Sequence, residues 1–183
     1  DVVTKVATSA ANWLKLETGA RAIAMSGAHT ASGQGVSSVA YNPAAITFLP
    51  ENKNQEVYFS KSNYLVDISH NVLGYARKLS RADYLGLQLF YLDSGEMDIT
   101  TAEYPDGGQG TFSVQQLCFR LSYGRIITNR LRIGGTFKMI REDIHTSYMQ
   151  SYAFDIGSNF DTGILTNSNG DNGVILGMSV SNF

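Results

Sequence analysis

Four charged residues stand at alternating positions within otherwise apolar or small-residue stretches of the chain: Arg120, Arg132, Lys138 and Asp155. An alternation with period two is typical of β-strands, because successive side chains point to opposite faces of a sheet. On one face of a sheet these groups can pair with one another, hold another segment of the chain or bind a solute. The pattern favours the structural roles over solute binding.

Other residue types offer little chemistry. The histidines His29, His70 and His145 have no i,i+4 spacing and no neighbouring cysteine, whereas a metal site needs convergent ligands. No serine lies in a Gly-x-Ser-x-Gly elbow, the motif of many hydrolase nucleophiles. The acidic pairs Glu96/Asp98 and Glu142/Asp143 are interpreted as solvated loop residues. We therefore expect no catalytic constellation, no metal and no cofactor.

Composition limits the class of protein. The chain has 183 residues, 43% hydrophobic and only 16% charged, with 18 glycines and a formal net charge of −2. These values suit one domain built from a sheet with tight turns. The sequence has no basic stretch of the kind found in nucleic-acid-binding proteins. The single Cys118 excludes an internal disulfide. No stretch approaches the roughly 18 apolar residues of a spanning helix, and a start at Asp1 fits an exported, processed product.

From Glu56 onward, hydrophobic alternation and turn signals predict a series of antiparallel strands. We place them at 57–62, 68–78, 84–92, 114–123, 131–141, 152–160 and 174–180. A further strand at 21–31 brings the number to about eight. A closed bacterial barrel needs an even number of strands and at least eight, so closure within the chain is one reading. A truncated larger barrel and a protomer that closes its edge with neighbours are the others.

The predicted strands have one bulky apolar face and one face of small residues and charges. A soluble β-sandwich buries the apolar face, whereas a membrane barrel turns it toward lipid. Periodicity is the same in both. Strand lengths near the roughly 9–11 residues that cross a bilayer and tyrosines near strand ends favour the barrel. Because a lipid-facing charge costs about 2–4 kcal/mol at the bilayer midplane, we expect Arg120, Arg132, Lys138 and Asp155 to face the lumen.

Residues 19–48 organise the chain, and a short helix within 2–16 precedes them. They comprise the small-residue strand at 21–31, a Gly/Ser-rich turn and the segment Asn42-Pro43-Ala44. Proline removes a backbone donor and restricts the residue before it, so this segment marks a change of direction. We expect the segment to pack inside or against the strands as a plug. An ordinary N-terminal cap is the alternative. The plug and turn residues of the 19–48 segment are predicted to be Gly19, Arg21, Gly27, Asn42 and Pro43.

Several short motifs, in order, resemble the PorV/PorQ family of outer-membrane proteins, which is related to the FadL-type transporters of hydrophobic compounds. They are AANWLKL at 10–16, GARAIAMSGA at 19–28, YNPAAI at 41–46, YLDSGEM at 91–97, IGGTFK at 133–138, FDIG at 154–157 and GMSVSNF at 177–183. The resemblance covers nearly the whole chain. The sequence departs from the family in having Ser26 where glycine is common, and in having fewer strands.

The resemblance implies one FadL/PorV-like domain: an antiparallel up-and-down β-barrel with the N-terminal segment (1–50) in its lumen and the strands at 51–183. It also implies the outer membrane of a Gram-negative-type bacterium as the location, with membrane lipid as a partner. Some family members are non-enzymatic shuttle or anchor subunits of type IX secretion, which makes secreted cargo or other secretion proteins expected partners.

Two alternative functions stay open at this point. A channel for hydrophobic compounds predicts an apolar pocket beside Asn42-Pro43. A structural protein that assembles through open β-edges predicts homo-oligomers, in the form of extracellular filaments or rings.

Overall fold

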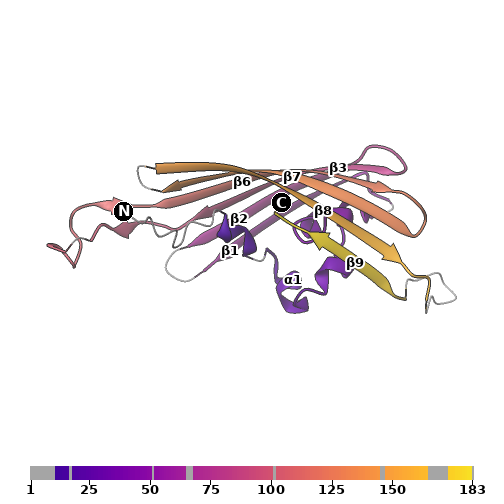
Figure 1. Cartoon of the computed structure of the whole chain (residues 1–183), viewed down its shortest axis with the longest axis horizontal. Coiled ribbons are helices and arrows are strands. Elements are labelled where there is room, and N and C mark those ends of the chain that lie inside the picture. The colour runs from indigo at the N-terminus through magenta and orange to yellow at the C-terminus, as the bar shows by residue number, and fades with distance from the viewer. Residues whose placement is uncertain are drawn as a thin grey trace, which may run out of the picture.

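Seven antiparallel strands form one curled, half-barrel sheet in the computed structural model (Figure 1). The structure describes residues 11–16, 18–50, 52–64, 68–100, 102–144, 147–164 and 173–182. The strands of the main sheet are β1 (Gln55–Asn63), β2 (Ser69–Lys78), β3 (Asp83–Asp93), β6 (Val114–Ile126), β7 (Leu131–Ile144), β8 (Ser147–Asp161) and β9 (Ile175–Val180). They lie side by side in chain order. The prediction of an all-β, sequentially connected antiparallel sheet is confirmed.

A two-stranded hairpin of β4 (Met97–Asp98) and β5 (Thr111–Phe112) interrupts this order between β3 and β6. It belongs to the long connection at one end of the sheet, which we call the long-loop end. The opposite end carries the tight connections 79–82 and 127–130, and we call it the short-turn end. In the main sheet, β1 and β9 are the two edge strands.

The predicted strand at 21–31 is wrong. Its residues form two short helices, α1 (Ala20–Met25) and α2 (His29–Ser32). Alanine has the highest helix propensity and gains little in a strand, and this stretch is rich in alanine. Between the helices, Ser26 and Gly27 have φ angles of 44° and 90°, which extended backbone does not adopt. The eighth strand of a closed barrel is therefore not supplied by this stretch.

Most of the bulky apolar side chains of the strands lie on the outer, convex face of the sheet and are exposed. Leu121, Phe137 and Phe154 are register neighbours on β6, β7 and β8, with exposed fractions of 41%, 45% and 43%. The residues that alternate with them point to the inner face and are mostly buried. The sheet is thus inverted relative to a soluble sandwich, where the larger apolar side chains are inside.

The N-terminal segment covers the inner face (Figure 1). Besides α1 and α2 it contains three short 3-10 helices: η1 (Asn12–Lys15), η2 (Val36–Ser38) and η3 (Pro43–Thr47). Val36, Val39, Ile46 and Leu49 pack with Ala76 and Tyr84 of the sheet, and Trp13 packs with a second group that includes Phe90 and Cys118. The main apolar contacts of the interior therefore join this segment to the sheet.

A series of glycines makes this close packing sterically feasible. Gly74, Gly86, Gly124, Gly134, Gly157 and Gly177, one on each strand from β2 to β9 in the main sheet, face the N-terminal segment. A Cβ at Gly86 would lie 2.5 Å from Ile46 Cδ1, and one at Gly134 would lie 2.6 Å from the Ala44 nitrogen. Only a residue without a side chain allows the segment to approach the sheet this closely.

Candidate functional site

Asn42 joins the N-terminal segment to the sheet from a fully buried position. Its Oδ1 accepts from the Ala44 backbone nitrogen at 3.0 Å and caps η3, a role typical of asparagine. Its Nδ2 donates to the Thr30 backbone oxygen at 2.8 Å and to Asn159 Oδ1 of β8 at 2.6 Å. The predicted change of direction at Asn42-Pro43 is therefore the place where the segment attaches to the sheet.

The other predicted plug residues differ in how closely they pack against the sheet. Pro43 begins η3 and packs against Gly134 and Gly157. Gly19 precedes α1 with a φ of 99°, and a Cβ there would lie 2.9 Å from Tyr58 Oη. Gly27 has positive φ but open space around it, and Arg21 on α1 is exposed. The structure thus brings Asn42 and Pro43 together against the sheet and leaves Arg21 and Gly27 away from it.

Lys138 and Asp155 form an ion pair on the inner face, with Nζ and Oδ2 2.6 Å apart and exposed fractions of 2% and 1%. Asn182 completes the group. Its Oδ1 accepts from Lys138 Nζ, and its backbone nitrogen donates to Asp155 Oδ1, each at 2.9 Å. A buried ion pair is tolerated when further hydrogen bonds satisfy it, and Asn182 provides them.

Arg120 is also buried on the inner face, beside Lys138 in register. Its guanidinium carbon lies 4.0 Å from the centroid of the Phe90 ring, within the range of a cation–π interaction. In the part of the chain that the structure describes, its Nε and Nη1 have no hydrogen-bond partner. The predicted cluster of inner charges thus contains a well-satisfied pair and one arginine held chiefly by an aromatic ring.

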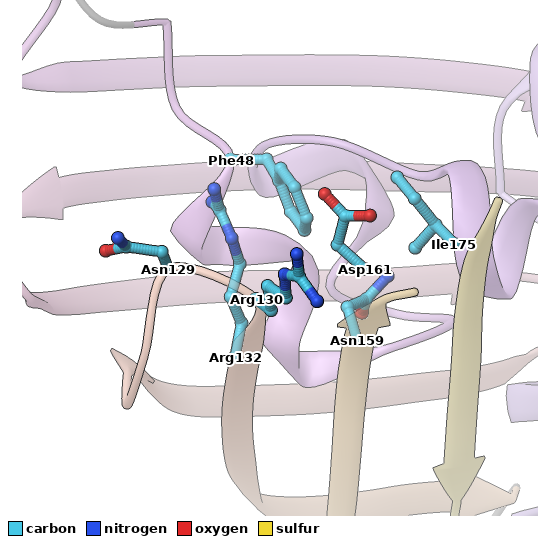
Figure 2. A pocket seen from close by; sticks show the side chains of 7 residues that line it. All are labelled: Phe48, Asn129, Arg130, Arg132, Asn159, Asp161 and Ile175. Atoms are coloured by element: carbon cyan, nitrogen blue, oxygen red, sulfur yellow. The ribbon is translucent and has the colours of Figure 1, made fainter. Parts of the chain in front are cut away.

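Arg132 lies apart from this cluster, at the short-turn end. Its guanidinium stacks on Phe48, with the carbon 3.8 Å from the ring centroid, and its Nη1 donates to the Thr47 backbone oxygen at 2.9 Å. Figure 2 shows Arg132 and Phe48 beside Arg130 and Asp161 around a small cavity. The four charges predicted as one group therefore form two sites.

Glu142 corrects a prediction from sequence. Its pairing with Asp143 suggested a solvated loop, but both lie in β7 and Glu142 is buried. Its Oε1 accepts from the backbone nitrogen of Ala11 at 2.9 Å, so it attaches the start of the described segment to the sheet. The extension of the period-two pattern beyond Arg141 was the available signal.

The histidines do not converge. His29 Nε2 lies 2.9 Å from Ser38 Oγ within the N-terminal segment, while His70 packs between Trp13 and Phe90. His145 lies outside the described residues. Among the residues that the structure describes, no group of three or more His, Cys, Asp or Glu could hold a metal ion.

Comparison with known proteins adds no assignment. The chain matches no protein-family model and no curated protein. The resemblance to the PorV/PorQ family therefore stays a prediction from the motifs.

The described helices are too short or too polar to cross a membrane. Chemically, the site combines an interior of apolar clusters and buried polar groups with an apolar exterior. The buried groups hold the N-terminal segment in place, and the basic groups at the short-turn end face a cavity.

Proposed function

We propose that the chain forms part of a non-enzymatic outer-membrane β-barrel of PorV/PorQ type, and that it serves as a shuttle or scaffold for exported proteins. The exposed apolar outer face is the observation that supports this most strongly. Register neighbours across the sheet are apolar in successive rows, such as Leu87, Leu121, Phe137 and Phe154. Lipid is the environment in which such a surface is stable.

Polar groups bound this apolar belt at both ends. Asp83 and Arg125 lie on the outer face at the short-turn end and form an ion pair of 3.6 Å. Asp93, Gln115 and Asp143 are register neighbours on the same face at the long-loop end. An apolar band between two polar margins is the pattern of a lipid-facing barrel wall.

The close packing around Asn42 and Pro43 favours a scaffold over a channel for hydrophobic compounds. A channel predicts an apolar pocket beside Asn42-Pro43, but both residues are fully buried and pack on β7 and β8. The long-loop end carries the 94–113 connection and its β4–β5 hairpin, which offers surface to a protein partner. The assignment to secretion rests on the resemblance.

Lipid contact can be tested on single cysteines. In a Cys118→Ser background, L121C and F137C report the outer face and R125C reports its polar margin. Labelled with a fluorophore and reconstituted, L121C and F137C should be strongly quenched by brominated lipid, and R125C weakly. Equal quenching of all three positions, or release of the native protein without detergent, would contradict a membrane location.

A second measurement tests the free-energy cost of placing a charge on the apolar outer face. An arginine at Phe154, within the belt, should destabilise the membrane-inserted protein by about 2–4 kcal/mol. Q150R on the same strand lies nearer the long-loop end and should cost at most about 1 kcal/mol. If F154R instead improves solubility without loss of stability, the apolar face meets water or another protein, and the membrane proposal fails.

Assembly through sheet edges is a second candidate function, because β1 and β9 are edge strands of the main sheet. An unpaired edge can accept a strand from another copy. Phe59 on β1 and Met178 on β9 are both exposed on the outer face. In the Cys118→Ser background, a mixture of F59C and M178C should give concentration-dependent cross-linked dimers if copies pair edge to edge. Absence of cross-linking at high concentration would exclude this assembly.

A further inference from the structure

The geometry points to a binding site for a phosphate monoester at the short-turn end, in a cleft between the N-terminal segment and the sheet. The cleft has a volume of about 490 Å³, and its lining includes Phe48, Leu49, Lys78, Arg81, Tyr84 and Arg132. This volume is in the range of small-molecule sites. The inference goes beyond the proposed function and does not depend on a membrane location.

Three cations line the cleft, two from the β2–β3 connection region and one from β7. Lys78 ends β2, Arg81 lies in the turn that follows it, and Arg132 is near the start of β7. The ion pairs of the described residues are Arg125–Asp83, Lys138–Asp155 and Arg141–Asp143. In that part of the chain, Lys78, Arg81 and Arg132 are thus left without a carboxylate within ion-pair distance.

Arg132 is pre-oriented for an anion. Stacking on Phe48 fixes the plane of its guanidinium, and the bond from Nη1 to the Thr47 backbone oxygen fixes its rotation. A guanidinium has five N–H donors, so donors beyond this bond are available for a ligand. A rigid arginine loses less entropy on binding than a mobile one.

Lys78 and Arg81 also line the cleft and add positive charge to it. Lys78 Nζ lies 5.9 Å from the Tyr84 ring centroid, and Arg81 is exposed in its turn. A carboxylate has two oxygens and is satisfied by one arginine. Three cations around one space suit a dianion with three terminal oxygens, which is the chemistry of a phosphate monoester. Phe48 and Leu49 provide apolar contact for the body of such a ligand.

Charges elsewhere at the strand ends agree with this assignment. Within the described connections and the two terminal residues of each main-sheet strand, every lysine and arginine lies at the short-turn end, where they outnumber the acidic residues Glu56, Asp83 and Asp161. The long-loop end carries acidic residues there: Asp93, Glu96, Asp98, Glu103, Asp106 and Asp143. The field along the sheet would therefore direct a dianion toward the cleft.

Calorimetric titration of the purified, detergent-solubilised chain with phenyl phosphate tests the site, with benzoate and phenol as matched probes. Phenyl phosphate should bind, phenol should not, and benzoate should bind at least about tenfold more weakly because it carries one charge. Raising the ionic strength should weaken binding. No binding of phenyl phosphate up to about 10 mM, or equal affinity for benzoate, would overturn the proposal.

Substitutions then locate the ligand. K78Q, R81Q and R132Q should each weaken phenyl phosphate binding by about tenfold or more, as loss of a charged hydrogen bond predicts. R77Q is the matched control, because Arg77 precedes Lys78 but points to the exposed outer face; it should change affinity less than about twofold. R81Q lies in an exposed turn and keeps the test valid if R132Q does not fold. Equal weakening by R77Q would show non-specific attraction and would overturn the assigned site.

Discussion

Nδ2 of Asn42 and Oδ1 of Asn159 lie 2.6 Å apart, although the residues are separated by 117 positions in the sequence. Asn159 in turn donates from Nδ2 to the Ala31 backbone oxygen at 2.9 Å. The two amides thus attach both η3 and α2 to β8. Since both side chains are buried, loss of either leaves hydrogen-bonding groups without partners.

Asn42→Ala should lower the free energy of unfolding by about 2–4 kcal/mol, because η3 loses its cap and the buried acceptors on β8, Asn159 Oδ1 and the Ser158 backbone oxygen, lose their donor. Asn71→Ala, on the outer face of β2, is the control and should change the free energy of unfolding by less than about 0.5 kcal/mol. Denaturant titration followed by Trp13 fluorescence measures both. Equal effects would mean that the Asn42 contacts do not hold the segment.

Gly134 and Gly135 are adjacent in β7 but face opposite sides of the sheet. A Cβ at Gly134 would meet the backbone of Pro43 and Ala44, whereas one at Gly135 would approach the Phe154 side chain at 3.1 Å. Gly134→Ala should therefore destabilise by about 1–3 kcal/mol through overpacking. Gly135→Ala should have a small effect, because a side-chain end can move.

Limited proteolysis shows whether Gly134→Ala destabilises the protein by displacing the N-terminal segment. If Gly134→Ala displaces the N-terminal segment, cleavage within residues 19–48 should become faster than in Gly135→Ala. Unchanged cleavage together with unchanged stability would show that the segment does not need the close approach.

The Lys138–Asp155 pair should be far more sensitive than the exposed pair Arg141–Asp143. Lys138→Met leaves a buried carboxylate without its cation and should cost about 3–5 kcal/mol. Arg141→Met removes half of an exposed pair and should cost less than about 1 kcal/mol. Unfolding free energies of both variants measure the difference. The combined variant Lys138→Met/Asp155→Leu should recover much of the loss, and failure to do so would assign the cost to packing.

Ser26 ends α1 in the left-handed region, with a φ of 44°, which is costly for a residue with a side chain. Ser26→Gly should therefore stabilise the chain by about 0.5–1 kcal/mol. Glycine is common at this position in the family that the motifs resemble, and the positive φ of Ser26 gives a physical reason for that preference. Ser32→Gly, at the last residue of α2, should destabilise instead, because glycine has a low helix propensity. A lower melting temperature for Ser26→Gly would contradict the assigned backbone conformation.

Hydrophobic alternation by itself determined where most strands lie. Val57, Tyr84 and Val114 were placed in strands from sequence and lie in β1, β3 and β6. Local patterns carry this information because side-chain direction in a strand depends only on neighbouring residues. The same patterns failed at 21–31, because small residues occur in helices and strands alike. There the chain forms two short helices, separated at Ser26 and Gly27 by positive φ angles.

Only the tertiary structure decided which face of the sheet is inside. Alternation is symmetric, so the sequence is compatible with Phe137 buried or exposed, and the structure exposes it. It also decided that Asn42 meets Asn159, that Glu142 holds Ala11, and that Arg132 separates from Lys138. These relationships depend on strand register and on a segment crossing several strands, and such long-range contacts leave no local periodic signal for the sequence to show.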